Sequence, residues 1–377
     1  MPRGQAAAWH PRASQRRLLL LGPAAAALLL LPSAAWLGQH ASRPLRGTAR
    51  RSAVARAVAG AAPFPAFLPE DAMRSIEEPA AVRMARALQA VEVPVPREVC
   101  GRPVRTSYYL SPEAPENAPV AVLLHGFDSS CLEWRRLVPA LEAEGVAALA
   151  VDILGWGFTE RPQDVPCDFS ADAKVRHLEA FLEEVLAERS GPVVLLGTSL
   201  GAAFAVALSL RRPDLADRLV TMSPQVFIDG IGPMASLPEP VAKLGVGVLG
   251  SEPLRSLANW LSYADPQTFA TDDAMRIGRL SVLTEGWADS TVSYMLSGGI
   301  AVSERVREIN LPTLCVLGRR DGIVEPEPTA ERFAEELASG DLAVEWVDDC
   351  GHVPHLERPV DTARLLVDWV RQQPAAA

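Results

Sequence analysis

The chain has 377 residues, enough for one large α/β domain with insertions or for two ordinary domains. Nine of its 36 basic residues lie in residues 1–69, which contain no acidic residue, so the rest of the chain holds 27 basic and all 46 acidic residues, a net charge of −19. This charge repels nucleic acid, so we exclude nucleic-acid binding. After residue 31 no apolar run reaches the roughly 20 residues of a spanning helix, so we expect no membrane span in the mature protein.

Residues 1–69 are predicted to be a targeting leader. Arginines precede an apolar run at 18–31, and small residues follow it, so the signal-like part is 1–35. Residues 36–69 are rich in Ala, Arg and Ser and lack acids, as in transit peptides. The two parts together resemble the bipartite presequences of proteins imported into complex plastids of algae, which implies a plastid location after cleavage of the leader. A mitochondrial transit peptide and entry into the secretory or endomembrane system are the alternatives.

The cysteines are odd in number and scattered, so we expect small buried side chains rather than a disulfide framework. They are Cys100, Cys131, Cys167, Cys315 and Cys350. Cys350 lies two residues before His352 and is the candidate for a reactive thiol. No C-x-x-C or His-rich pattern indicates a metal site, and we expect no cofactor.

Residues 70–94 are predicted to form a helical extension, because apolar residues repeat at helical spacing on either side of Pro79. A β-hairpin is then expected, with strands at 97–100 and 104–110.

From residue 120 onward, short apolar strands alternate with amphipathic helices. The strands are expected at 120–124, 146–151, 193–196, 218–222, 312–318 and 342–347, and the helices at 132–144, 171–189, 202–210, 328–339 and 360–372. This alternation predicts an α/β core, 95–228 and 303–374, with a mostly parallel sheet covered by helices on both faces. Ligands of such sheets bind at the carboxyl ends of the strands.

Residues 229–302 break the alternation with prolines, glycines and short helical pieces. An insertion at this point is predicted to fold as a helical cap over the carboxyl ends of the strands. Most of its apolar residues are expected to form its own core. The candidates for lining a substrate pocket are Met234, Trp260, Trp287 and Met295.

Gly197-Thr198-Ser199-Leu200-Gly201 joins the strand at 193–196 to the helix at 202–210. In this context G-x-S-x-G is typical of a nucleophile elbow, a tight turn that raises a serine hydroxyl at the edge of the sheet. Gly197 and Gly201 are needed because larger side chains would collide with the strand or the helix. Ser199 is therefore the candidate nucleophile.

Ser199 needs a base and an acid, and this motif places them later in the chain in the order Ser, acid, His. His352 and His355 both qualify, and His352 is preferred because it follows a glycine after the last strand. Asp321 follows the strand at 312–318 and is the expected acid, which orients the imidazole. Asp348 and its neighbour are too near His352 in sequence to reach its far nitrogen.

The oxyanion hole requires two backbone N–H groups. Leu200 supplies one, directly after the nucleophile. Phe127, in the loop after the strand at 120–124, is expected to supply the second, with Gly126 allowing the backbone path and His125 bracing the loop.

Five motifs together resemble the α/β-hydrolase fold superfamily, in its capped, epoxide-hydrolase-like branch, over about residues 95–372. They are His125-Gly-Phe127, Asp152-Ile-Leu-Gly-Trp-Gly157, Gly197-Thr-Ser-Leu-Gly201, Gly318-Arg-Arg-Asp321 and Gly351-His-Val-Pro-His-Leu-Glu-Arg-Pro359. The resemblance implies an eight-stranded sheet and a Ser199, Asp321, His352 triad. Residues 232–238 also look similar to plastid hydrolases of plants and algae. Epoxide hydrolases and haloalkane dehalogenases of this branch carry Asp where this chain has Ser199, which argues against both activities.

The favoured function is a serine hydrolase, a carboxylesterase or lipase type enzyme that acts on a small to medium hydrophobic ester through an acyl-enzyme. An acyltransferase, a peroxidase-like enzyme or a hydrolase of carbon–carbon bonds would use the same triad. A ligand receptor that keeps the fold is the alternative outside enzymes. In each case the expected partner is a small hydrophobic molecule, and the sequence indicates no oligomeric state.

Overall fold

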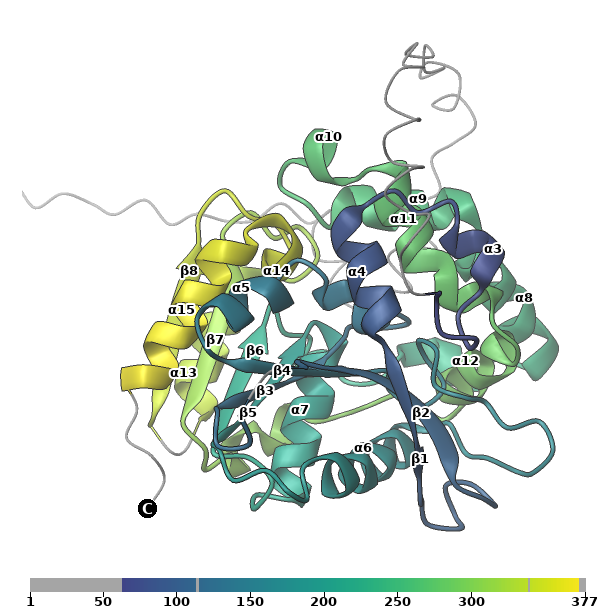
Figure 1. Cartoon of the computed structure of the whole chain (residues 1–377), viewed down its shortest axis with the longest axis horizontal. Helices are drawn as coiled ribbons and strands as arrows, with labels where there is room; N and C mark the ends of the chain where they lie inside the picture. The colour runs from purple at the N-terminus through teal and green to yellow at the C-terminus, as the bar shows by residue number, and fades with distance from the viewer. Residues whose placement is uncertain (1–62, 113–114, 338–339, 373–377) are drawn as a thin grey trace, which may run out of the picture.

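One eight-stranded sheet forms the centre of the protein (Figure 1). The computed structural model describes residues 63–112, 115–337 and 340–372. The strand order is β1-β2-β4-β3-β5-β6-β7-β8; β1 pairs with β2, and β2 with β4, in antiparallel fashion, and the pairs from β4 through β8 are parallel. The strands are β1 (Gln89–Val93), β2 (Val104–Leu110), β3 (Val120–Leu124), β4 (Ala147–Val151), β5 (Val193–Thr198), β6 (Arg218–Met222), β7 (Thr313–Gly318) and β8 (Leu342–Val347). The predicted α/β-hydrolase type of sheet is confirmed.

Helices cover both faces of this sheet, so its central strands are buried on both sides. Alternate side chains of β3 point to opposite faces of the sheet and enter two different apolar clusters. Val120, Val122 and Leu124 belong to the cluster on the first face, and Ala121 and Leu123 belong to the cluster on the second face. The first face carries α6 (Ala171–Val185), α7 (Leu200–Arg211) and α13 (Pro326–Glu336), and the second carries α5 (Val138–Ala143) and α15 (Pro359–Gln372). Burial on both faces explains why these strands read as continuous apolar runs in the sequence.

The edge of the sheet near the N-terminus differs from the prediction. The predicted helical extension ends early, because Gln89–Val93 forms β1, and β1 rather than residues 97–100 pairs with β2. The prolines after β1 stop the strand, and the Val99 N–H donates to the Pro96 carbonyl (2.8 Å) in a turn. Five residues of an exposed edge strand give too short an alternation to be recognised after a helical pattern.

Two short helices, α3 (Glu70–Met73) and α4 (Pro79–Ala87), precede the sheet and pack on its second face. Their apolar residues Met73 and Met84 are buried there, as the helical spacing predicted. Phe64 and Leu68, from the last part of the predicted leader, pack into the same cluster. Residues 1–62 of that leader lie outside the described residues.

Helices also make up the segment between β6 and β7, which we call the insertion (residues 229–302). They are η3 (Gly232–Ser236), α8 (Glu239–Leu249), α9 (Glu252–Leu261), α10 (Pro266–Phe269), α11 (Asp272–Arg279), η4 (Leu280–Leu283) and α12 (Trp287–Leu296); η5 (Ser303–Glu308) then leads to β7. Figure 1 shows these helices in green, grouped at one side of the sheet. Within the described residues, none of the helices combines the length and apolar character that crossing a bilayer requires.

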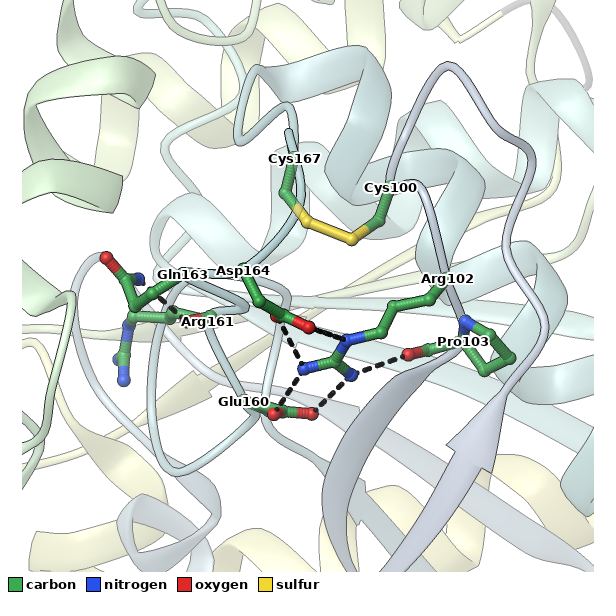
Figure 2. The surroundings of a disulfide bond; sticks show 8 residues. All are labelled: Cys100, Arg102, Pro103, Glu160, Arg161, Gln163, Asp164 and Cys167. Carbon is green, nitrogen blue, oxygen red and sulfur yellow. Dashed lines mark hydrogen bonds and ion pairs between the residues drawn. A yellow bond between two sulfur atoms is a disulfide. The ribbon is translucent and has the colours of Figure 1, made fainter.

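The expectation of unpaired cysteines is wrong for two of the five. Cys100 and Cys167 form a disulfide, which joins the β1–β2 loop to the segment before α6 (Figure 2). Figure 2 also shows Arg102 donating to Glu160 (2.8 Å) and Asp164 (3.1 Å) beside it, so the same two segments are held by ion pairs. The two cysteines are 67 residues apart in sequence, a separation that no short spacing pattern reveals.

Candidate active site

Ser199 lies in the sharp turn between β5 and α7. Its backbone has φ 51° and ψ −122°, a sparsely populated conformation for a residue with a side chain. A Cβ added at Gly197 would lie 2.2 Å from the Gly201 carbonyl oxygen, and one added at Gly201 would lie 2.2 Å from the Leu124 carbonyl oxygen. Only glycine fits either position, so the two glycines allow the tight turn that presents the Ser199 side chain at the end of the sheet.

Asp321 and His352 are brought together by the ends of β7 and β8. The Nδ1 atom of His352 lies 2.8 Å from Oδ2 of Asp321, and the other Asp321 oxygen accepts the Ile323 and Val324 N–H groups at 2.8 and 3.0 Å. Burial by itself would raise the Asp321 pKa, but the charge of His352 and these hydrogen bonds lower it. Burial likewise opposes the charged form of His352, yet Asp321 raises the His352 pKa above its ordinary value. The pair is therefore an imidazole oriented and polarised by an ionised carboxylate.

The loop that carries His352 is held by the insertion. The His352 N–H donates to the Ser262 carbonyl (2.8 Å), and the Glu357 carboxylate accepts the N–H groups of Gly351 (2.7 Å), Ala264 (3.1 Å) and Asp265 (2.8 Å). A displacement of the segment that follows α9 would therefore act directly on the backbone of His352.

His355, the alternative base, points elsewhere. It is completely buried, its Nε2 lies 3.4 Å from Oε1 of Glu133, and its ring lies 4.7 Å from that of Trp134. Burial lowers the His355 pKa. The other oxygen of Glu133 accepts the Gly126 N–H at 2.8 Å, so these residues brace the loop after β3.

The loop after β3 lies beside Ser199, since a Cβ on Gly126 would be 3.5 Å from the Ser199 Cβ. His125 accepts the Ile153 N–H at Nε2 (3.1 Å), so the neutral ring carries its proton on Nδ1 and donates to the Gly126 carbonyl (2.8 Å). Both ring nitrogens of His125 are thereby used within the loop. Within the described part of the chain, neither the Phe127 nor the Leu200 N–H donates to a protein acceptor, so both donors are free for a ligand.

The four pocket candidates separate into two groups. Met234 and Met295 line one small apolar cavity of about 60 Å³ under α8, together with Leu237, Ala242, Gly245, Leu249 and Leu254. Trp260 is 47% exposed and Trp287 is buried, and neither lines this cavity. A more open hollow between α8 and α12 is lined by three charged residues together with polar and apolar residues of α12 and Ser297, and it touches none of the site residues described above.

Cys350 is buried, and burial together with the nearby Glu357 raises its pKa, so the thiolate is disfavoured. The interpretation of Cys350 as a reactive thiol is therefore wrong. The described residues contain no group of three or more His, Cys, Asp or Glu side chains placed to hold a metal ion.

Three acidic residues of the site were not identified from the sequence: Asp128, Glu133 and Glu357. Glu133 and Glu357 accept backbone N–H groups from the loops that carry Phe127 and His352, and Asp128 accepts the Trp287 side chain of α12. The available signal was their position inside or near the His125 and Gly351 motifs, but the Asp128–Trp287 and Glu357–Ala264 contacts join segments 159 and 93 residues apart. Local sequence therefore could not assign these contacts.

Comparison with known proteins identifies the family of this chain. A model of the alpha/beta hydrolase family matches residues 121–365. The alpha/beta hydrolase domain-containing protein VTE7 of Arabidopsis thaliana is 36% identical over 309 residues, 81% of this chain and 90% of that protein.

Two bacterial relatives are more distant. The 2-hydroxy-6-oxo-6-(2'-aminophenyl)hexa-2,4-dienoic acid hydrolase of Metapseudomonas resinovorans is 27% identical, covering 69% of this chain and 87% of that enzyme. The pimeloyl-[acyl-carrier protein] methyl ester esterase of Aromatoleum aromaticum is 28% identical, covering 68% and 99%. The chain thus belongs to the alpha/beta hydrolase family.

Proposed function

We propose that this protein is a serine hydrolase that cleaves a small to medium hydrophobic carboxylic ester. The observation that carries the proposal is the Asp321–His352 pair (2.8 Å) at the carboxyl ends of β7 and β8, in the same sheet whose β5 ends in the strained Ser199 turn. A nucleophile, a polarised imidazole and two unused N–H donors at one sheet edge are the components of acyl transfer.

In the proposed reaction, Ser199 Oγ attacks the ester carbonyl while His352 Nε2 takes the hydroxyl proton. The Phe127 and Leu200 N–H groups stabilise the oxyanion, and Asp321 stabilises the imidazolium. The proton then passes to the leaving alkoxide, which departs as an alcohol and leaves an acyl-Ser199. Water, deprotonated by His352, attacks this ester, and the carboxylic acid departs as the serine hydroxyl is restored.

The apolar cavity under α8, in the insertion, supports a hydrophobic substrate. Its lining residues, Met234 and Met295 among them, include no charged side chain. An apolar acyl or alcohol group is stabilised there by burial, at about 25 cal/mol per Å² of apolar surface. A 2-hydroxy-6-oxo-dienoic acid, the kind of compound named for the Metapseudomonas relative, carries a carboxylate for which this cavity has no cation. The lining therefore favours neutral esters over such acids.

The test is a panel of p-nitrophenyl esters of increasing acyl length, assayed with the parent protein and Ser199→Ala. We expect the parent kcat/KM to rise with chain length, and Ser199→Ala to lose about 10⁵-fold or more in kcat. Ser190→Ala, which alters an exposed serine before β5, is the matched control. Hydrolysis that survives Ser199→Ala would refute the proposal, and turnover of a dienoic acid but of no ester would replace it with carbon–carbon bond hydrolysis.

We also propose a plastid location, supported by the leader composition and by the plant origin of the VTE7 relative. Because Phe64 and Leu68 pack into the core, the mature chain is expected to begin between residues 36 and 63. N-terminal sequencing of the native protein tests this. A start at or before residue 36, which leaves the whole transit-like part in place, contradicts the plastid location.

A further inference from the structure

Asp128 is a buried acid directly after Phe127, the proposed oxyanion donor. Its side chain is fully buried and its backbone has φ 51°. Oδ1 accepts the Trp287 Nε1–H at 2.7 Å, and Oδ2 accepts a hydrogen bond from the Arg255 guanidinium. Trp287 begins α12 and Arg255 lies on α9, so within the described residues both side-chain donors to this carboxylate come from the insertion.

Arg255 connects this acid to several helices of the insertion. Its Nε donates to the carbonyl of Leu249, at the end of α8 (3.0 Å), and its NH1 lies 3.4 Å from the carbonyl of Gly278, in α11. The same NH1 lies 3.5 Å from the Asp128 carbonyl. One largely buried guanidinium therefore ties α8, α9 and α11 to the peptide that follows Phe127.

The Phe127 side chain is also held by the insertion. Its ring lies 6.1 Å from that of Tyr294, on α12, and 5.4 Å from that of Trp156 in the loop after β4. The core restrains the same loop through Glu133, which accepts the Gly126 N–H (2.8 Å), and through His125, whose Nδ1 donates to the Gly126 carbonyl (2.8 Å). The peptide that bears the Phe127 N–H is thus held at its carbonyl by His125 of the core, and Asp128, which follows Phe127, is held by the insertion.

We propose that Asp128 is a positioning residue that makes the oxyanion hole depend on a seated insertion. The proposal rests on the proposed function, because it assigns the Phe127 N–H to the oxyanion. When α9 and α12 are seated, Arg255 and Trp287 fix Asp128 and so the direction of the preceding N–H. When they lift, a buried carboxylate loses both donors and has to turn toward water, which turns the N–H away. Acyl transfer is then confined to the form in which the insertion is seated.

The test uses three substitutions that remove the contacts with little change of shape: Asp128→Asn, Trp287→Phe and Arg255→Lys. Asn is chosen because it tolerates the positive φ of this position. Arg276→Lys, on an exposed residue of α11, is the matched control. Each variant is assayed for kcat and KM on a soluble ester, and for binding of a trifluoromethyl ketone, whose adduct with Ser199 places an oxyanion in the hole.

Removal of a whole oxyanion donor lowers kcat about 10²–10³-fold, which sets the upper limit. We expect Trp287→Phe to lower kcat about ten-fold and Asp128→Asn about ten- to a hundred-fold, with KM within about two-fold of the parent. The affinity for the trifluoromethyl ketone should fall by the same factor as kcat/KM. A general loss of packing would not produce this agreement.

Two outcomes overturn the inference alone: folded variants with parental kcat, or a lower kcat with unchanged ketone binding. If Asp128→Asn does not fold, Trp287→Phe and Arg255→Lys decide by the same readouts. A parent protein whose hydrolysis does not require Ser199 overturns the proposed function, and this inference with it.

Discussion

The turns at the strand ends and helix α8 of the insertion differ in the room around their glycines. At the strand ends, a Cβ on Gly197 or Gly318 would lie 2.2 or 2.0 Å from a backbone oxygen. In α8 of the insertion, a Cβ on Gly245 or Gly247 meets nothing within 4 Å, and Leu244 is 72% exposed. The turns at the strand ends therefore admit only glycine at these positions, whereas α8 leaves room for a side chain at Gly245 and Gly247.

The largest expected effect is on the strand side. Asp321→Asn keeps the shape of the acid but no longer selects the tautomer of His352 with Nε2 unprotonated, so we expect kcat to fall about 10⁴-fold with KM little changed. Steady-state kinetics on a p-nitrophenyl ester measures this. Asp348→Asn, whose exposed side chain pairs with Arg319, is the control and should keep parental kcat. A loss below ten-fold for Asp321→Asn would assign the role of acid to another residue.

The pH dependence examines the same pair. His352 acts as a base only when neutral, and Asp321 raises its pKa above the ordinary 6.5. Activity is therefore present above the His352 pKa and is lost as the pH falls through it. Below this pKa, kcat/KM should fall about ten-fold for each pH unit. The acidic limb of the parent should lie above pH 6.5, and that of Asp321→Asn at lower pH. Profiles with the same midpoint for both proteins would show that Asp321 does not set it.

Matched glycine substitutions test the comparison directly. Gly197→Ala forces a Cβ onto backbone atoms, so we expect a loss of about 3 kcal/mol or more in the free energy of unfolding. Gly247→Ala adds a methyl group to open space within α8 and should gain about 0.5–1 kcal/mol. Urea unfolding measures both. Equal effects at the two positions would remove the distinction between the regions.

The disulfide between Cys100 and Cys167 is expected to make a smaller contribution to the stability of the core. Replacing Cys100 and Cys167 with serine removes the link across 67 residues and should cost about 2–4 kcal/mol of stability, with unchanged preference for ester chain length. Thermal unfolding with and without reductant measures it, because reductant should lower the Tm of the parent but not of the double variant. Alkylation of five thiols in the unreduced, unfolded parent would show that the disulfide is absent.

Much of the fold was predictable because buried parallel strands are continuous apolar runs and the elbow follows from local sterics at Gly197 and Gly201. Strand β1 was not predictable, since a short edge strand has only a weak alternation of apolar and polar residues. The disulfide and the contacts of Asp128 join segments far apart in sequence, which periodicity cannot reveal.

The pocket candidates show the same limit on prediction. Aromatic and methionine residues of the insertion were chosen by type, but burial decides their role. Met234 and Met295 line a common cavity, Trp287 instead binds Asp128, and Trp260 is exposed. Which side of a short helix faces inward depends on the packing of α8 on α12, and the sequence of either helix alone does not specify it.

The most direct test of the central proposal is mass spectrometry of the full chain after reaction with a fluorophosphonate, followed by peptide mapping. The account predicts one phosphonate per protein, bound at Ser199, with labelling that is abolished in Ser199→Ala and slowed in Asp321→Asn. An unlabelled parent protein, or an adduct on any other serine, would contradict the assignment of Ser199 as the nucleophile.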